Sequence, residues 1–463
     1  MRRPPAMLGT MTIADMQGLV LKYDRPVPRY TSYPTAPHFH AGIGPGEMTR
    51  WIGETDPQAP ISLYLHVPYC KQMCSYCGCH TKIVARYQPV EDFVGRLQRE
   101  IALVAAAFGS RRRLGQVHWG GGTPNMVAGD DIRRIHDSIA AHFTIDASTE
   151  HAMELDPRLI APELLQALSD CNVTRVSLGI QDFDPAVQAA INREQPFALV
   201  EDKVAALRGA GILGINFDLI YGLPRQTRAG VAHSVELALA LQPERFAIFG
   251  YAHVPWLKKH QRLIDEATLP DAALRLDLAR DAAEIITGAG YRRIGLDHFA
   301  LRSDPLTRAL DAGTLRRNFQ GYTTDSAETL IGLGPSAISA FPGGYAQNAA
   351  DIPLWSRAIG EGRLATQRGL TLDNEDRWRR AAIERLMCFG TVDLAALGAE
   401  FHLTERRFAA ERARLAPLVA DGIVAWQGSR LTVTPSGEPL IRVVAAAFDT
   451  YLNAGPGRHS RAV

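Results

Sequence analysis

Residues 61–80 read ISLYLHVPYCKQMCSYCGCH, an apolar run followed at once by four cysteines. The run at 61–67 has the length of a strand and is almost continuously apolar, which is typical of a strand buried on both faces. The first three cysteines, Cys70, Cys74 and Cys77, have the spacing Cys-x3-Cys-x2-Cys, and Cys79 follows. A disulfide framework spreads its cysteines along the chain, so this tight cluster indicates a metal site instead.

Further runs of strand length follow along the chain. They are QVHWGGG (116–122), HAMELDP (151–157), TRVSLGIQ (174–181), INFDLIYG (215–222) and RFAIFGYA (245–252). Stretches with helical period separate them, as at 90–104, where apolar residues recur at spacings of three and four. Alternating strands and helices predict βαβ units around a parallel sheet. We therefore expect an α/β fold, a partial (β/α)6 TIM-type barrel that RRIGLDHFA (292–300) would extend. A doubly wound open sheet is the alternative.

Changes in composition and hydrophobic pattern along the chain predict three parts. Residues 1–55 form an irregular, partly helical opening with many prolines, and residues 56–360 carry the barrel. Residues 361–463 form a smaller, mostly helical domain, in which NEDRWRRAAIERLM (374–387) precedes an apparent hairpin at 423–434. Helix, hairpin and a last helix resemble a winged-helix module. Its arginines are interleaved with acids, as on a solvated helical face, so we expect no nucleic-acid partner.

Composition narrows the class of protein further. A net charge of +1 over 463 residues provides no basic field for nucleic acid or an anionic membrane. No uncharged apolar stretch approaches the roughly 18–20 residues of a membrane span, so we expect a cytoplasmic protein without membrane contact. Cys171 and Cys388 stand among apolar neighbours, and we expect both to be core residues.

The cysteine spacing itself favours one kind of metal site. Three thiolates leave one iron of a [4Fe–4S] cube open for a ligand, as catalytic metal sites require. The loop also follows the first strand, at the edge where α/β barrels place their active sites. A structural zinc site could use any four of Cys70, Cys74, Cys77, Cys79 and His80, but zinc sites usually have a second cysteine pair. A ferredoxin-type cluster would need a fourth ligand and x2 spacing throughout.

A glycine-rich motif, WGGGTP (119–124), follows the second strand. Glycines let the backbone approach a ligand closely, and the backbone amides can then bind it. The motif, together with Cys-x3-Cys-x2-Cys and Tyr76 before the third cysteine, resembles the radical S-adenosylmethionine superfamily.

Within that superfamily the chain resembles the oxygen-independent coproporphyrinogen III oxidase family, from about residue 20 to the C-terminus. The motifs that carry this resemblance occur in order: PRYTSYPTA (28–36), LYLHVPYC (63–70), CGC (77–79), HWGGGTP (118–124), ELDPR (154–158), GIQDF (179–183), INREQ (191–195), FDLIYGLP (217–224), GYAH (250–253), LDHFA (296–300), RNFQGYTT (317–324), GYAQN (344–348) and AAFDTYL (446–452).

The resemblance implies a reaction and its cofactors. Two propionates of coproporphyrinogen III would be oxidatively decarboxylated to vinyl groups, giving protoporphyrinogen IX. A [4Fe–4S] cluster and two molecules of S-adenosylmethionine would generate the 5′-deoxyadenosyl radicals that the reaction needs. A ferredoxin or flavodoxin would supply electrons, and we expect a monomer. The alternative is a haem chaperone of the same wider family, although such chaperones usually lack the CGC continuation and the PRYTSYP opening.

The resemblance also assigns roles to residues. Cys70, Cys74 and Cys77 match the cluster ligands, whereas Cys79 matches a cysteine that the family keeps without using it as a ligand. The positions that match contacts to the cluster-bound S-adenosylmethionine are Tyr64, Tyr76, Gly121, Glu154 and Ile338. Those that match the second molecule are Gly122, Thr123, Gln181, Arg193, Asp218 and Ala252. Taken alone, Gln181 and Asp218 could merely satisfy loop amides, and Arg193 and Glu154 could form ion pairs. Arg29 and Arg317 are candidates for binding substrate carboxylates.

Metal analysis separates the cluster from the zinc alternative. We expect protein purified without oxygen to contain iron and no stoichiometric zinc, because the spacing suits an open-site cluster. Stoichiometric zinc without iron would contradict this assignment and favour a structural zinc site.

Overall fold

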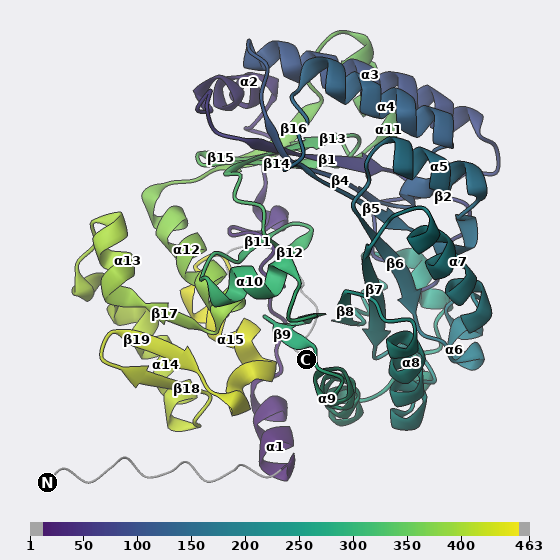
Figure 1. Cartoon of the computed structure of the whole chain (residues 1–463). Helices are drawn as coiled ribbons and strands as arrows, with labels where there is room; N and C mark the ends of the chain where they lie inside the picture. Colours follow the sequence, from purple (N-terminus) through teal and green to yellow (C-terminus); the bar gives the residue numbers. More distant parts are fainter. Residues whose placement is uncertain (1–12, 453–463) are drawn as a thin grey trace, which may run out of the picture.

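A computed structural model describes residues 13–452. Its largest element is a twelve-stranded sheet in the order β16-β15-β14-β13-β1-β4-β5-β6-β7-β8-β10-β9. Six neighbouring strands run parallel in chain order: β1 (Ile61–Val67), β4 (Leu114–Gly121), β5 (Glu150–Leu155), β6 (Arg175–Gln181), β7 (Gly214–Tyr221) and β8 (Arg245–Gly250). They confirm the predicted partial (β/α)6 barrel, which Figure 1 shows as a curved, open sheet.

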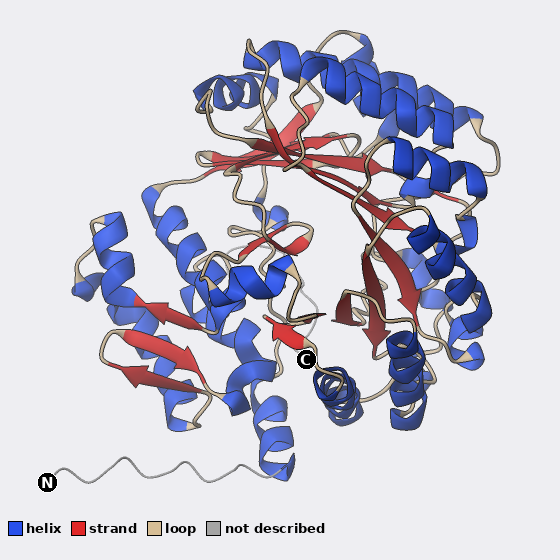
Figure 2. Cartoon of the chain, viewed as in Figure 1, coloured by secondary structure: helices blue, strands red, loops and turns tan. Residues whose placement is uncertain are grey.

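Helices cover the outer face of this sheet (Figures 1 and 2). They are α3 (Gln88–Phe108), α4 (Gly129–His142), α5 (Pro162–Asp170), α6 (Pro185–Ala190), α7 (Phe197–Gly209), α8 (Arg228–Ala240) and α9 (Ala272–Gly288). The longest, α3, buries Val90, Phe93, Val94, Leu97, Ile101 and Val104, the positions whose spacing predicts it. It ends where Gly109 takes the left-handed conformation, at φ +67°, which costs glycine nothing.

The sheet continues beyond the barrel strands at both ends. Next to β1 lies the parallel β13 (Thr329–Leu333), followed by antiparallel β14 (Ile338–Phe341), β15 (Gly344–Asn348) and β16 (Thr366–Thr371). At the other end, β9 (Arg292–Ile294) and β10 (His298–Ala300) form an antiparallel hairpin on β8. The run at 292–300 therefore extends the sheet, but as a hairpin and not as another βα unit.

The C-terminal part combines helices with a small sheet. Its elements are α12 (Asn374–Phe389), β17 (Thr391–Asp393), α13 (Leu394–Phe401), α14 (Ala409–Ala420), β18 (Val424–Gln427), β19 (Arg430–Val433) and α15 (Ile441–Ala445). The predicted hairpin at 423–434 is β18–β19, and β17 adds a third strand to it. Because β16 still pairs with β15 in the large sheet, we propose that the boundary lies after Thr371 and not at residue 360.

The N-terminal segment binds the two large parts together. Between α1 (Ile13–Tyr23) and α2 (Pro45–Glu54), Val27, Tyr30 and Tyr33 are buried in the core of the C-terminal part. Arg442 donates hydrogen bonds to the carbonyl oxygens of residues 27 and 28. The remaining elements are β11 (Arg316–Asn318) paired with β12 (Gly321–Thr323), α10 (Pro305–Asp311) and α11 (Ile352–Gly360). Among residues 13–452, no helix is long and apolar enough to cross a membrane.

A buried carboxylate on α3 braces the loop after β13. Glu100 accepts hydrogen bonds from the Gly334 amide (2.7 Å), from Asn348 Nδ2 (2.7 Å) and from Trp355 Nε1 (3.1 Å). Burial disfavours the charged form, and these bonds only partly offset it, so the pKa of Glu100 rises from 4.5 to about 7.

The raised pKa of Glu100 predicts a pH dependence of stability. The folded state holds a proton on Glu100 that the unfolded state releases above about pH 4.5, so stability falls as the pH rises from 5 to 8. The free energy of unfolding is measured by chemical denaturation for the wild type and for Glu100→Gln, whose side chain does not titrate. The difference between the two removes the contribution of the histidines, which titrate in both proteins. We expect the wild type's stability relative to the variant to drop by on the order of 2 kcal/mol between pH 5 and 8. A difference that stays constant or grows would contradict the assignment.

Candidate active site

The cysteine loop projects from the carboxyl end of β1. Short parallel strands β2 (Tyr69–Cys70) and β3 (Lys82–Ile83) close its base. Cys70 and Cys74 are buried, Cys77 is half-buried and Cys79 is exposed, and all four are free thiols. The residues predicted as cluster ligands therefore share one short loop with no disulfide among them.

Segments that follow two other strands, β6 and β8, hold this loop through hydrogen bonds. The Ser75 amide donates to the carbonyl of Ile191, which lies beyond β6 (3.0 Å). After β8, Gln261 Nε2 donates to the carbonyl of Tyr76 (2.8 Å) and His260 Nε2 to that of Cys77 (2.7 Å). Lys258 Nζ donates to the carbonyl of residue 79 (2.8 Å). The loop is thus fixed through its backbone, which leaves the thiols available.

Hydrogen-bond donors face the sulfur atoms. The hydroxyls of Thr81 and Thr123 donate to Cys70 Sγ (3.0 and 3.2 Å), and Arg193 Nη1 lies 3.6 Å from Cys74 Sγ. Burial still raises the pKa of Cys70. The pKa of Cys77 falls to about 6, because it accepts hydrogen bonds from residue 79 and lies near two basic side chains. Such donors favour the thiolate, the form that binds iron.

The glycine-rich loop after β4 packs directly against the cysteine loop. The Gly122 amide donates to the carbonyl of Val67 (2.8 Å), and the Thr123 amide to that of Tyr69 (2.9 Å). A Cβ at position 122 would lie 2.6 Å from Thr81 Oγ1 and 2.7 Å from the Tyr69 carbonyl oxygen. Only glycine fits at position 122.

Four residues predicted for the cluster-bound S-adenosylmethionine lie along β1, β4, β5 and β14. Tyr64 pairs with His118 in the sheet register, and His118 Nε2 lies 3.3 Å from Glu154 Oε1. The Gly121 amide donates to Glu154 Oε2 (3.3 Å). Ile338 lies on the other side of β1, close to Gly332, which pairs with Tyr64 in the sheet. The contact is so close that a Cβ added to Gly332 would lie 2.6 Å from the Ile338 carbonyl oxygen. Tyr76 lies on the cysteine loop itself.

Of the residues predicted for the second molecule, Gly122 and Thr123 follow β4, and the other four lie further along the sheet, on β6 and β7 and in the segments after β6 and β8. Arg193 Nη2 donates to the carbonyl of Gly179 (2.8 Å), the β6 partner of Asp218. Gln181 ends β6 in the left-handed region, at φ +67°. The Ala252 carbonyl accepts from Gln261 Nε2 (3.2 Å). Burial raises the pKa of Asp218 to about 6, against hydrogen bonds from Ser177 (2.7 Å) and Asn216 (2.8 Å).

The arrangement suits a cluster better than a single ion. Within residues 13–452, no three His, Cys, Asp or Glu side chains are grouped so that they could hold one metal ion. A [4Fe–4S] cube makes no such demand, because each thiolate binds a different iron. His80 turns its ring nitrogen to the carbonyl of Ala350 (2.7 Å), so the one histidine among the candidate zinc ligands already has a hydrogen-bond partner. The free thiols and their donors therefore fit the cube.

Several residues at the site escape sequence reasoning. The segment after β8 donates hydrogen bonds to the backbone of the cysteine loop from Lys258, His260 and Gln261. Its sequence carries no recognisable motif. Thr81 lies just beyond the cysteines and carries no signal of its own. Asp156, which lies 3.3 Å from Arg193, stands within ELDPR, and that motif could have pointed to it.

Comparisons with known proteins agree with this geometry. Residues 64–238 match the family model of the radical SAM superfamily, and residues 372–440 match that of the HemN C-terminal domain. The oxygen-independent coproporphyrinogen III oxidase of Bradyrhizobium diazoefficiens is 47% identical over 94% of this chain and 97% of its own length. That of Pseudomonas aeruginosa is 39% identical over 94% and 95%. The solved structure of coproporphyrinogen III oxidase (HemN) from Escherichia coli is described as that of a radical SAM enzyme. It superposes on this chain with a TM-score of 0.88 at 35% identity, and the match covers 92% of this chain and all of that one.

The fold and the site thus define a radical SAM enzyme, a class that uses a [4Fe–4S] cluster and S-adenosylmethionine. Within that class, the chain belongs to the oxygen-independent coproporphyrinogen III oxidase family.

The contact between the two loops predicts the effect of a single methyl group. Gly122→Ala should push the glycine-rich loop off the cysteine loop and lower the iron and sulfide bound after anaerobic reconstitution by more than half. Gly78→Ala is the matched control, because a Cβ there meets nothing within 4 Å. Equal iron content in the two variants would show that the loops do not need this close contact.

Proposed function

We propose that this enzyme converts coproporphyrinogen III to protoporphyrinogen IX without oxygen. Two propionate side chains become vinyl groups. For each, R–CH2–CH2–COO⁻ gives R–CH=CH2 and CO2, and the substrate loses one hydrogen atom and one electron. The substrate, and its oxidation without oxygen, are those in the names of relatives that align over nearly the whole chain. The observation that carries the proposal is the contact of the cysteine loop with the glycine-rich loop in a chain of this family.

The bound cluster and S-adenosylmethionine would supply 5′-deoxyadenosyl radicals, which remove the hydrogen atom from each propionate. The protein's own residues bind and orient. Cys70, Cys74 and Cys77 would hold three irons. Glu154 offers a carboxylate to an ammonium group at the carboxyl end of β5, beside the amide of Gly121. Tyr64, Tyr76 and Ile338 complete that first site.

A second S-adenosylmethionine would lie towards β6 and β7. Asp218 can accept from ribose hydroxyls, and its pKa of about 6 leaves it mostly charged at neutral pH. Arg193 has a buried Nε without a partner, so the guanidinium keeps one donor for a carboxylate. Gly122, Thr123, Gln181 and Ala252 complete the second site.

The proposal extends to the setting of the reaction. We expect a monomeric enzyme in the cytoplasm, with a ferredoxin or flavodoxin as electron donor. Free thiols at every described cysteine are consistent with a reducing compartment.

An anaerobic assay tests the proposed function. Reconstituted protein is incubated with dithionite, S-adenosylmethionine and coproporphyrinogen III, and the products are separated by chromatography. We expect protoporphyrinogen IX together with 5′-deoxyadenosine, and neither from Cys74→Ser, which lacks one cluster ligand. Deoxyadenosine without a vinyl product would contradict the substrate and favour another reaction or the haem-chaperone role. Absence of both products would contradict the radical chemistry.

A further inference from the structure

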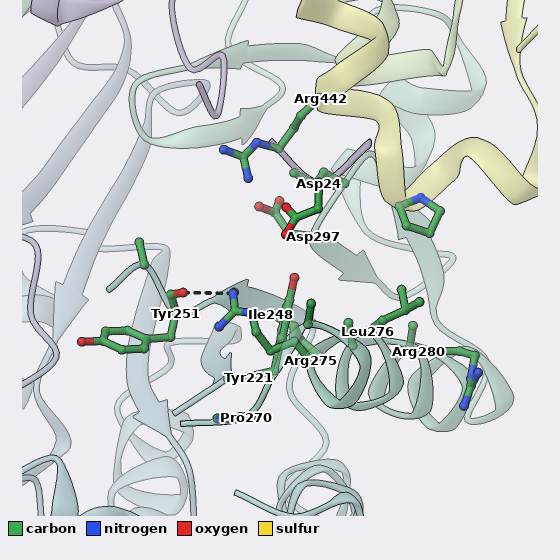
Figure 3. Close-up of a pocket in the computed structure, with 18 of the residues that line it drawn as sticks. Asp24, Tyr221, Ile248, Tyr251, Pro270, Arg275, Leu276, Arg280, Asp297 and Arg442 are labelled. Atoms are coloured by element: carbon green, nitrogen blue, oxygen red, sulfur yellow. Dashed lines mark hydrogen bonds between the residues drawn. The ribbon is translucent and has the colours of Figure 1, made fainter. Parts of the chain in front are cut away.

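A cavity of about 1000 Å³ opens between the barrel and the C-terminal part. Its lining comes from three separate regions: the N-terminal segment at Arg29, the barrel around Tyr221 and Arg275, and α15 at Arg442. Figure 3 shows Arg442, Asp24 and Asp297 on one side, facing Tyr221 and Arg275 on the other. The volume is at the upper end of the range for small-molecule sites.

A hydrogen-bonded side chain links the wall of the cavity to the cysteine loop. Gly250 and Ala252, which follow β8, line its wall. Gln261 Nε2 donates both to the carbonyl of Ala252 (3.2 Å) and to that of Tyr76 (2.8 Å). One side chain therefore joins the cavity wall to the loop that carries the proposed cluster ligands, so a large ligand in the cavity could present one end to the reaction centre.

Positive charge is concentrated at the inner end of the cavity. Arg29 donates to the carbonyl of Gly250, Arg275 Nη2 donates to that of Tyr251 (3.0 Å), and Arg442 donates to residues 27 and 28. Arg317 lies behind them, with Nη2 3.3 Å from the Arg29 carbonyl oxygen. The printed contacts of Arg29 and Arg275 are to neutral carbonyls, which hold these two guanidinium groups in place without neutralising them.

The nearby acids only partly balance this charge. Asp297 is paired with His298 at 2.8 Å, and its pKa is lowered, against burial, by that bond and by Arg317 and Arg29. Asp24 is the second carboxylate. The other acids of the lining are engaged elsewhere: Glu438 pairs with Arg293 (3.1 Å), Glu284 with Arg280 (3.7 Å), and Asp271 caps α9. Arg29, Arg275 and Arg442 thus line the cavity beside two carboxylates, which leaves a local excess of positive charge. Moreover, Nε and Nη1 of Arg317 are buried without a hydrogen-bond partner, an arrangement that is costly unless an anion is bound nearby.

Apolar side chains make up another part of the lining. Ile248, Leu276 and Phe299 contribute aliphatic and aromatic surface beside the arginines. A ligand that fits is therefore large, mostly apolar and anionic at its edge. A tetrapyrrole with propionate side chains has these properties.

We propose that this cavity binds the macrocycle of the substrate, and that Arg29, Arg275 and Arg442, supported by Arg317 through the backbone of Arg29, form an arginine cluster that holds a propionate not undergoing oxidation. This inference rests on the proposed function, because it takes the substrate from it. It assigns the cluster a role in substrate affinity and selectivity. The propionate held at the inner end anchors the ring, so that another propionate reaches the cysteine loop.

Substitutions on two different elements test the arginine cluster. Arg275→Gln on α9 and Arg29→Gln on the N-terminal segment each remove one charge. The matched control is Arg228→Gln on the neighbouring helix α8, because Arg228 is not part of the lining of the cavity and pairs with Asp281 of α9 (2.6 Å). Thermal unfolding and iron content verify that each variant is folded and holds its cluster.

Two measurements are made on the reconstituted enzymes: the KM for coproporphyrinogen III, and fluorescence titration with coproporphyrin III and with its tetramethyl ester. We expect each cluster variant to raise the KM and the Kd for the tetracarboxylate by about 10-fold, the equivalent of roughly 1.4 kcal/mol. The Kd of the uncharged ester and the Kd of S-adenosylmethionine should stay unchanged, as should every value for Arg228→Gln.

The outcomes separate this inference from the proposed function. If the wild type forms no vinyl product, the proposed function fails. If it forms the product and both cluster variants keep the wild-type KM and Kd, the arginine cluster does not bind the substrate. Weakened binding of S-adenosylmethionine in place of coproporphyrin would assign the cavity to the second cofactor molecule and overturn the inference.

Discussion

The parallel pairing of β1 with β4 is the constraint on which the site depends. Its register sets Val67 opposite Gly121, so the two strands end together and their loops must share the space beyond. The Gly122 amide then reaches the carbonyl of Val67, and the hydroxyl of Thr123 reaches Cys70 Sγ. A shift of one residue would turn the side chains of β1 to the opposite face and separate the loops. The position of the cysteines is therefore a consequence of sheet register, and the short loop only presents them.

The same register organises the inner face of the barrel. Alternate residues of neighbouring strands point inward, while their neighbours pack apolar side chains under the helices. His118 contacts Glu154, and Ser177 contacts Asp218, and each pair joins two neighbouring strands. Because these polar groups bond to each other, the inner face can stay polar without a large cost of burial. A polar interior lined by strands is rigid, which suits a reaction that must hold a radical near one substrate atom and away from water.

Much of this could be predicted from the sequence, because the signals are local. The strand at 61–67 is found with the same bounds, and burial of Cys171 and Cys388 follows from their apolar neighbours. The direction of β9 and β10 could not be predicted, because runs of three residues carry no sign of parallel or antiparallel pairing. Gln261 and Arg442 act on residues far away in the chain, at 76 and at 27–28, so only the fold brings them into contact. Sequence motifs thus pointed to the proposed cofactor residues and to Arg29 and Arg317, whereas the supports of the cysteine loop and the positions of Arg275 and Arg442 needed the structure.

The open side of the barrel explains why those distant contacts exist. The sheet order ends at β16 and β9 without closure, so no strand covers the space between them. The N-terminal segment and the C-terminal part pack together there, with Tyr30 bonded to Asp449 (2.9 Å) and Arg442 bonded to the backbone of the segment. Because the N-terminal segment and the C-terminal part cover this side, they can carry charged side chains there that a continuous β-barrel wall would have to bury. The barrel's opening would therefore give the proposed anionic substrate both an entrance and a charged wall, while the strands keep the proposed cofactor residues in fixed register.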